Sequence, residues 1–311
     1  MDELIAQAPA MREAVRLADR VARTDANVLV TGESGAGKDA LAVYVHRRSR
    51  RAAAPLVKID CAALPAALLE AELFGFERGA FTGATQAKPG RLEAAHKGTL
   101  VLDEIAHLTP DAQAKLLRVI ERREFERLGG RRTVRVDARL VALTNVDLDD
   151  AVRRRAFRPD LFYRLNVVRI EVPPLRERAE DVAPLARHFL RLFAVKHGRR
   201  ARQLSADALV LLAAYDWPGN VRELAHVLER AVIVAEGERV EVEALPEAVR
   251  AAAALRRRRA RRLTLAELEA EYIAETLAAL GGNKSAAARA LGISRKNLYE
   301  KLARYKTEVR G

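Results

Sequence analysis

The sequence predicts a parallel α/β fold in the first half of the chain and an all-helical second half. Five short strand-like runs are separated by segments with helical spacing, and they cover residues 28–30, 56–60, 98–102, 139–143 and 167–170. Strands that alternate with helices are typical of a parallel sheet with helices on both faces. From residue 174 onward helical spacing dominates, as in Val182, Leu185, Phe189 and Phe193.

Composition limits the kind of protein. The chain has 311 residues, enough for two or three domains, and 55 Lys and Arg against 42 Asp and Glu give a formal net charge of +13. This charge favours a polyanionic partner. Cys61 is the only cysteine, which excludes an internal disulfide and fits a reducing compartment. Because the longest apolar run (208–215) is too short to cross a bilayer and the N-terminus has no signal peptide, we expect a soluble, cytoplasmic protein.

The strand at residues 28–30 leads into a predicted phosphate loop. Gly32 to Lys38 fits G-x-x-x-x-G-K, and residues 40–45 can continue as a helix. Glycines let successive N–H groups converge on phosphate oxygens, while Lys38 can reach the β- and γ-phosphates. A Gly-rich turn before a surface helix is the alternative, but both flanks favour a nucleotide. We expect nucleotide contacts from Gly32, Glu33, Ser34, Gly35, Ala36, Gly37, Lys38 and Asp39.

Asp39 stands where the general motif has a Ser or Thr that holds magnesium. A carboxylate there can hold the metal directly or through water, but it also adds negative charge beside the phosphates. The sequence leaves both effects open.

Acidic and amide side chains follow two further predicted strands. Asp103 can hold magnesium, and Glu104 can orient and deprotonate the attacking water. The alternative for this pair is an acid that caps the next helix. Thr144 and Asn145 end another strand and can either hydrogen-bond the γ-phosphate or merely end the strand.

A glycine-flanked excursion lies between the second and third strands. Gly79 and Gly83 permit a tight reversal that leaves Phe81 and Thr82 at its tip. An exposed aromatic tip indicates a partner contact. A hairpin whose Phe81 folds back onto its own helix is equally compatible with the sequence.

The C-terminal segment carries a predicted helix-turn-helix. A capping box at Thr264 begins a helix through Leu280 whose apolar residues lie on more than one side, one for internal packing and one, around Tyr272 and Leu277, for a second copy. Two short helices joined at Gly292 follow, and the second is basic. Leu298 and Leu302 should anchor it. The DNA-binding candidates are Arg295, Lys296, Asn297, Tyr299 and Lys301.

Two alternatives remain open for this region. The helices can instead form a basic three-helix assembly module. Residues 250–262 contain seven arginines and no acid, which suits either a phosphate-contacting arm or an inert basic linker.

Residues 79–84 spell GAFTGA, which resembles the signature of bacterial enhancer-binding proteins, the AAA+ activators that remodel RNA polymerase carrying sigma-54. The resemblance covers nearly the whole chain. It extends over the phosphate loop, residues 102–105, 157–165 and 217–224, and a C-terminal Fis-type domain. It implies that Arg158 and Arg164 are arginine fingers supplied to a neighbouring subunit and that Arg222 senses the nucleotide. It also implies that Gly79, Ala80, Phe81, Thr82, Gly83 and Ala84 contact the sigma factor.

The sequence departs from the family pattern at three positions. Asp60 stands where the family has an asparagine that holds the catalytic glutamate between turnovers, and an acid there would repel ionised Glu104 unless a proton or a basic group lies between them. Asp39 replaces the usual Glu, and Phe76 replaces the usual His. Family members often begin with a receiver or ligand-sensing domain, whereas this sequence enters its ATPase domain almost at Met1. We therefore expect it to have no N-terminal regulatory domain.

The resemblance implies an AAA+ nucleotide-binding subdomain at 1–173, a helical lid at 174–248, a basic linker at 249–262 and a Fis-type helix-turn-helix domain at 263–311. We expect ATP and Mg²⁺ as cofactors. The expected partners are sigma-54 polymerase holoenzyme, double-stranded DNA with an inverted repeat, further copies of the chain in a dimer that converts to a hexameric ring, and a regulatory protein acting in trans. The rival hypotheses are a DNA-binding regulator that uses nucleotide only as a ligand and an unrelated AAA+ machine.

Overall fold

The computed structural model describes residues 4–251 and 264–308, and among them the side chains up to residue 304. These residues form two compact units that divide after Pro246, and each is described by itself. The predicted basic linker lies almost entirely outside the described residues. Among the described helices, none combines the length and the apolar character needed to cross a bilayer.

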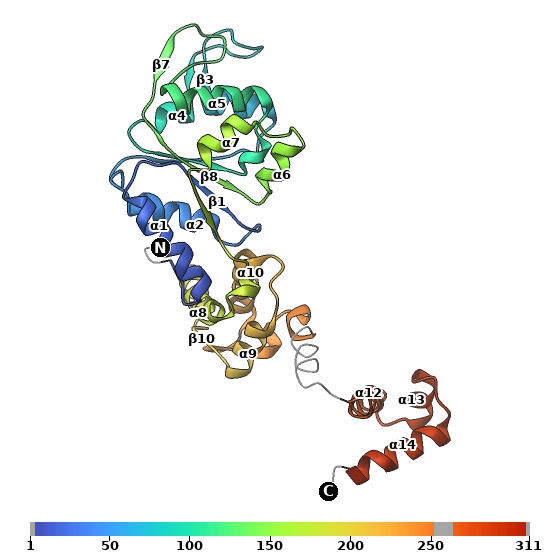
Figure 1. The fold of residues 1–311 in the computed structure, drawn as a ribbon. Helices are drawn as coiled ribbons and strands as arrows, with labels where there is room; N and C mark the ends of the chain where they lie inside the picture. Colours follow the sequence, from blue (N-terminus) through green and yellow to red (C-terminus); the bar gives the residue numbers. More distant parts are fainter. Residues whose placement is uncertain (1–3, 252–263, 309–311) are drawn as a thin grey trace. The chain divides into compact units, whose positions relative to one another are not determined.

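A five-stranded parallel sheet forms the centre of the first unit (Figure 1), as the sequence predicts. Its strand order is β2-β5-β8-β1-β9. The strands are β1 (Val28–Thr31), β2 (Leu56–Asp60), β5 (Thr99–Asp103), β8 (Arg139–Thr144) and β9 (Val168–Glu171). Because all neighbours are parallel, their carboxyl ends, which carry the predicted site residues, lie along one edge.

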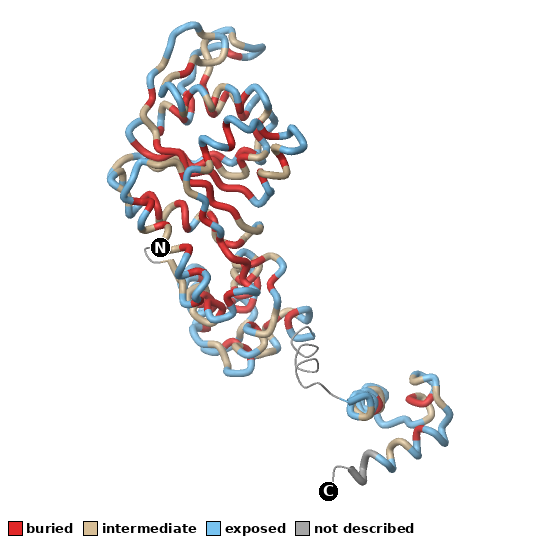
Figure 2. The backbone as a smooth tube through the Cα atoms, in the orientation of Figure 1, coloured by how far each residue is buried: buried red, intermediate tan, exposed pale blue. Residues whose placement is uncertain are grey.

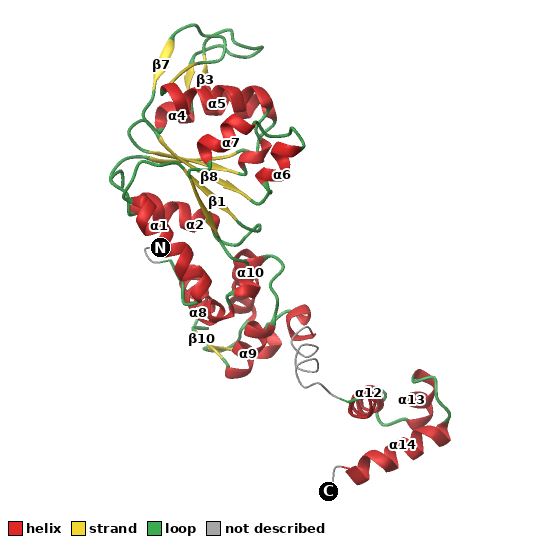
Figure 3. Cartoon of the chain, in the orientation of Figure 1, coloured by secondary structure: helices red, strands yellow, loops and turns green. Residues whose placement is uncertain are grey.

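Helices cover both faces of this sheet (Figure 3). One face packs on α1 (Pro9–Ala22) and α2 (Lys38–Arg47). The other packs on α3 (Ala66–Phe74), α4 (Arg91–Ala94), α5 (Pro110–Arg122), α6 (Leu148–Arg153) and α7 (Pro159–Leu165). Strand β1 shows the alternation that this requires, because Val28 and Val30 join the first core and Leu29 joins the second.

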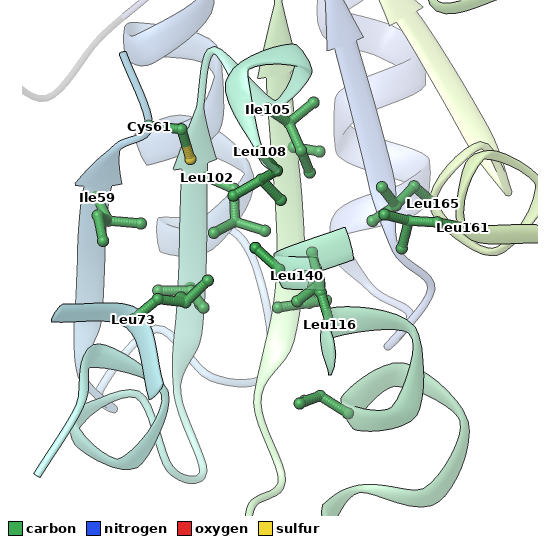
Figure 4. Close-up of a cluster of buried hydrophobic side chains, with 14 of the residues drawn as sticks. Ile59, Cys61, Leu73, Leu102, Ile105, Leu108, Leu116, Leu140, Leu161 and Leu165 are labelled. Carbon is green, nitrogen blue, oxygen red and sulfur yellow. The ribbon is translucent and has the colours of Figure 1, made fainter. Parts of the chain in front are cut away.

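The second core is built from strand and helix side chains that interdigitate (Figure 4). Ile59, Leu102 and Leu140 project from three strands, while Leu73, Leu116 and Leu161 come from the covering helices. Burial is concentrated in the strands and in the helix faces turned toward them (Figure 2).

The predicted helical lid follows the sheet. It contains η2 (Leu175–Glu177), α8 (Ala179–Lys196), β10 (Gln203–Leu204), α9 (Ala206–Ala214), α10 (Asn220–Val234), β11 (Arg239–Val240) and η3 (Val242–Ala244). Ser205 caps α9 by accepting from the N–H of Ala208 at 3.2 Å. Trp217 is fully buried between α9 and α10 and donates to the carbonyl of Leu212 at 2.9 Å.

Several short elements were not predicted. They are a turn of 3₁₀ helix η1 (Ile105–His107) and two antiparallel hairpins, β3 (Gly75–Phe76) with β4 (Lys88–Pro89) and β6 (Glu124–Glu126) with β7 (Thr133–Arg135).

The second unit contains α12 (Leu265–Ala279), α13 (Lys284–Ala290) and α14 (Arg295–Glu308). Ile273, Ala287, Ala288 and Leu298 form its small core. Leu298 is fully buried and Leu302 packs beside it, as the sequence predicts.

Arg139 ties the sheet to α1 from the first position of β8. Its side chain is buried, and its guanidinium donates to the carbonyls of Val21 (2.9 Å), Ala22 (3.1 Å) and Ala26 (3.2 Å). Burial lowers the pKa of Arg139, and the nearby Asp25 opposes the shift.

We expect Arg139→Ala to lower the free energy of unfolding by about 3 kcal/mol, because three carbonyls each lose a hydrogen bond from a buried guanidinium. Urea unfolding followed by circular dichroism measures the loss. Arg16→Ala is the control, since Arg16 is exposed and pairs only with Glu13 on the same helix; its cost should stay below about 0.5 kcal/mol. Equal small losses would contradict this role of Arg139.

Candidate functional site

The phosphate loop follows the carboxyl end of β1 and leads directly into α2. Gly37 has a φ of 104° and open space where a Cβ would lie, which suits a backbone that faces a ligand. Gly35 has a different constraint. With φ at 74°, a Cβ there would lie 2.5 Å from the carbonyl oxygen of Gly219, so this glycine lets the lid approach the loop.

Lys38 is the first residue of α2 and is buried. Its Nζ donates to the carbonyls of Gly32 (2.9 Å) and Glu33 (3.2 Å) and lies 3.8 Å from Oε1 of Glu104. Burial lowers the pKa of Lys38, while the charges of Glu104 and Asp103 oppose that shift. The structure therefore brings the two predicted motifs together.

Glu104 follows β5 with a left-handed backbone, at φ 51°. It precedes η1 but makes no side-chain capping bond, so the helix-cap alternative does not describe it. Instead, its Oε2 accepts from the backbone N–H of Asn145 at 3.3 Å. Asn145 thus meets Glu104 through its main chain. Asp60, at the end of β2, accepts from the N–H of Ala62 at 2.9 Å.

Asp39 and Asp103 converge on one cation within the protein, the ammonium of Lys58. Lys58 Nζ donates to Oδ1 of Asp39 and lies 2.9 Å from Oδ2 of Asp103. Both carboxylates can therefore share a single positive charge. Carboxylate oxygens are the ligands that Mg²⁺ prefers, so this pair fits the predicted metal.

Arg158 and Arg164, the predicted arginine fingers, lie at the two ends of α7. Arg158 pairs with Asp160 at 2.7 Å, and Arg164 Nε donates to Glu121 at 3.2 Å. Asn27, the residue before β1, donates to the carbonyl of Arg164 at 3.1 Å. The phosphate loop follows the other end of β1, roughly 16 Å away at about 3.3 Å per strand residue. Arg164 therefore lies at the sheet edge opposite the phosphate loop of its own chain.

The GAFTGA loop closes on itself between β3 and β4, since the N–H of Gly79 donates to the carbonyl of Ala84 at 2.8 Å. Phe81 packs edge-on against Phe76 of β3, with ring centroids 4.9 Å apart, yet it remains 43% exposed. It therefore folds back onto a strand rather than a helix and still presents an aromatic surface. Thr82 is exposed, whereas Ala84 is buried, so Ala84 differs from the predicted surface contact.

A second hairpin supports this loop. The N–H of Glu77 donates to the carbonyl of Leu128 at 2.9 Å, and the N–H of Leu128 donates to the carbonyl of Gly75 at 3.0 Å. Arg127 pairs with both Glu77 (3.1 Å) and Glu93 (2.8 Å). The turn after β6 is thus joined to the base of the loop by main-chain and side-chain bonds.

In the second unit, the first turn of α14 is exposed and carries Arg295, Lys296 and Asn297. Tyr299 is also exposed, and Lys284 lies over its ring at 4.9 Å. Lys301 differs from the prediction because it is half-buried and pairs with Glu269 of α12 at 2.6 Å.

The exposed apolar face of α12 also differs in part from the prediction. Leu277 packs against the small core of the unit. The exposed face contains Leu265, Leu268 and Tyr272, spaced as on one side of a helix.

Comparison with known proteins covers the same three regions. The model of the Sigma-54 interaction domain family matches residues 4–171, and that of the AAA+ ATPase lid domain matches residues 176–262. The model described as bacterial regulatory protein, Fis family, matches residues 264–305. The chain is 44% identical over 310 residues to the regulatory protein AtoC of Escherichia coli (strain K12), covering 97% of this chain and 67% of AtoC. The chain belongs to the sigma-54-dependent activator family.

Further relatives support the same family assignment. The transcriptional regulatory protein FlbD of Caulobacter vibrioides is 45% identical over 318 residues, covering 97% of this chain and 70% of FlbD. The crystal structure of NtrX from Brucella abortus in complex with ATP has a TM-score of 0.72 and 36% identity, covering 97% of this chain and 69% of NtrX. This sigma-54-dependent activator thus carries an AAA+ ATPase domain and a Fis-type DNA-binding domain, and its partner classes are sigma-54 and DNA.

The activator's lid contacts the phosphate loop through residues that sequence reasoning partly missed. Arg222 Nη1 donates to Ser34 Oγ at 2.9 Å and so contacts the phosphate loop. Asn220, to which the sequence assigns no role of its own, donates through its amide to Glu33 (3.0 Å) and to the carbonyl of Ser34 (3.1 Å). The Gly219-Asn220 pair was the signal in the sequence, because asparagine adopts a left-handed backbone more readily than most residues, and Asn220 has a φ of 54°.

Two lid arginines were also missed. Arg176 donates to both carboxylate oxygens of Glu33 at 2.7 and 2.9 Å. Arg178 is buried and donates to the carbonyl of Ala36. The hydrogen bonds from Arg176 and Asn220 lower the pKa of Glu33 to about 2.

We expect Glu33→Gln to remove a pH-dependent contribution to stability. The pKa of Glu33 is depressed in the folded state, so its contribution is present above the ordinary value of 4.5 and lost as pH falls toward 2. Because Glu33 is half-exposed, the difference in unfolding free energy from wild type should be only about 1 kcal/mol at pH 6, shrinking toward pH 3. Urea unfolding at both pH values measures it.

Glu177→Gln is the matched control, since Glu177 meets the same arginine at 3.7 Å but is 61% exposed. It should behave as wild type at both pH values. A pH-independent difference for Glu33→Gln would contradict the assignment.

Proposed function

We propose that this activator hydrolyses MgATP and uses the energy to convert closed promoter complexes of sigma-54 polymerase into open complexes. The observation that carries the proposal is a convergence at one sheet edge. Lys38, Glu104 and Asp103 meet there, and an exposed aromatic loop is joined to the hairpin that directly follows α5.

The residues divide the chemistry among them. Lys38 binds the β- and γ-phosphates and neutralises their charge. Glu104 accepts a proton from the attacking water, and the N–H of Asn145 holds its carboxylate in place. Magnesium, held by Asp39 and Asp103, would neutralise charge on the phosphates. Arg222 brings the lid to the nucleotide from the other side of the loop.

Neighbouring subunits complete the site. Arg164 lies at the sheet edge opposite its own phosphate loop, so it can act only on the nucleotide of another copy, together with Arg158 at the start of the same helix. This arrangement supports a ring, which we propose to be a hexamer assembled from dimers. A lone protomer should be nearly inactive.

ATP hydrolysis moves the GAFTGA loop, and the loop acts on sigma-54 through Phe81 and Thr82. Thr109, which lies shortly after Glu104, caps helix α5 by accepting from the N–H of Ala112 at 3.1 Å. The same helix ends at the β6–β7 hairpin, which is bonded to the loop. A change at Glu104 can therefore reach the loop along α5 and then through the hydrogen bonds that join the two hairpins.

DNA is bound by α14 in the major groove, with Arg295, Lys296 and Asn297 near the base edges. The exposed face formed by Leu265, Leu268 and Tyr272 pairs two copies, so the DNA site is an inverted repeat. We propose that the protein acts in the cytoplasm and that a separate regulatory protein controls its activity in trans.

The experiment that tests this function is ATP-dependent open-complex formation with sigma-54 holoenzyme. Thr82→Ala should abolish it while ATP turnover and DNA binding stay within about twofold of wild type, because Thr82 is exposed and far from the nucleotide motifs in sequence. Thr85→Ala, in the same loop but outside the motif, is the control and should remain active. Retained activation by Thr82→Ala, or loss of its ATP turnover, would contradict the partner assignment.

Subunit mixing tests the arginine finger. Arg164→Ala should lower turnover by about 10³-fold or more, as expected when an arginine finger is lost. Adding Glu104→Gln protein, which is inactive itself but carries Arg164, should restore part of the turnover. Arg154→Ala, an exposed arginine paired with Asp150, is the control. Mixed oligomers that form but show no rescue would argue against supply in trans.

A further inference from the structure

Lys58 occupies a position that the proposed chemistry does not use. It lies in β2, where Ile59 faces the core and Lys58 lies on the more open side of the strand. Its ammonium meets Asp39 from the first turn of α2 and Asp103 from the end of β5. One side chain thus joins the two predicted magnesium ligands, which come from different elements.

The ammonium of Lys58 lies between two carboxylates. Its Nζ donates to Oδ1 of Asp39 and lies 2.9 Å from Oδ2 of Asp103, so one positive charge faces two carboxylates. Lys38, the other ammonium in the site, is engaged with the carbonyls of Gly32 and Glu33 and lies beside Glu104. The two lysines therefore neutralise different carboxylates.

The side chain of Lys58 can also move away from the two carboxylates. Its side chain is 46% exposed while that of Asp103 is only 14% exposed, so the ammonium can move into water when another cation takes its place on these oxygens. A divalent cation that binds Asp39 and Asp103 must displace it, because two cations cannot share these oxygens without strong repulsion.

We propose that Lys58 is a built-in competitor of the divalent cation: it holds Asp39 and Asp103 together in the metal-free site and gives way when Mg²⁺ enters with the nucleotide. This inference rests on the proposed role of the two carboxylates as metal ligands. In the metal-free site, Lys58 shields the phosphates from two bare carboxylates. The affinity of the site for the divalent cation therefore depends on the charge of Lys58 as well as on the two carboxylate ligands.

The test is an equilibrium measurement on the full chain without turnover. Mn²⁺ binding to the nucleotide-free protein is followed by electron paramagnetic resonance, and ADP affinity is measured by calorimetry with Mg²⁺ and with EDTA. In Lys58→Gln, Mn²⁺ should bind about fivefold more tightly, the size of effect that one charge in an exposed pair supplies. ADP should bind more weakly in EDTA, so that the Mg²⁺ enhancement of ADP affinity rises by about the same factor.

Three further variants make the outcome decisive. Lys58→Arg keeps the charge and should retain wild-type Mn²⁺ affinity. Lys88→Gln removes a similarly exposed lysine of β4 from its ion pair with Glu72 of α3 and should change neither readout. Asp103→Asn should abolish Mn²⁺ binding.

Unchanged or weaker Mn²⁺ binding in Lys58→Gln would overturn the inference, as would an equal loss of ADP affinity with and without Mg²⁺, which would make Lys58 a phosphate ligand. If Asp103→Asn binds Mn²⁺ normally, the metal ligands in the proposed function are wrong. If Asp103→Asn loses Mn²⁺ while Lys58→Gln stays at wild type, only the competitor role fails.

Discussion

A single buried amide, that of Asn220, holds the phosphate loop of this activator against its helical lid. Its oxygen accepts from the N–H of Leu175 at 2.7 Å, and its nitrogen donates to Glu33 and to the carbonyl of Ser34. The side chain is fully buried, so each lost bond would leave a polar atom without water. The nucleotide loop, the segment leaving the sheet and the first turn of α10 therefore all meet at this one residue.

The surrounding contacts depend on this arrangement. Because the lid is held close, the carbonyl of Gly219 reaches the loop at a point where only glycine fits, and Arg222 reaches Ser34. Arg176 and Arg178 then bring positive charge to Glu33 and to the carbonyl of Ala36. A ligand that changes the loop must also change the lid, which is how a small nucleotide can affect a large helical element.

The parallel sheet supplies the second constraint. Parallel strands end at the same edge, so the residues after β1, β2, β5 and β8 are neighbours although they are far apart in sequence. Charge is balanced within this edge, with Lys38 beside Glu104 and Lys58 between Asp39 and Asp103. The opposite edge carries Arg164. The sheet therefore separates the parts of the site that one chain provides from the part that we assign to a neighbour.

The sequence alone determined the strands, the phosphate loop, the acidic pair after β5 and the family, because these features depend on local spacing and on motifs that are contiguous in the chain. It also identified Leu298 as an anchor of α14. Tertiary structure decided what spacing cannot encode. The contacts of Asn220, Arg176 and Lys58 join residues from separate elements, and the two short hairpins need partners that local propensity does not specify. Phe81 could be exposed or packed until β3 placed Phe76 beside it, and Lys301 faces α12 rather than solvent because Glu269 lies opposite. A motif fixes which groups are present, but only packing of distant segments fixes which charges and rings meet.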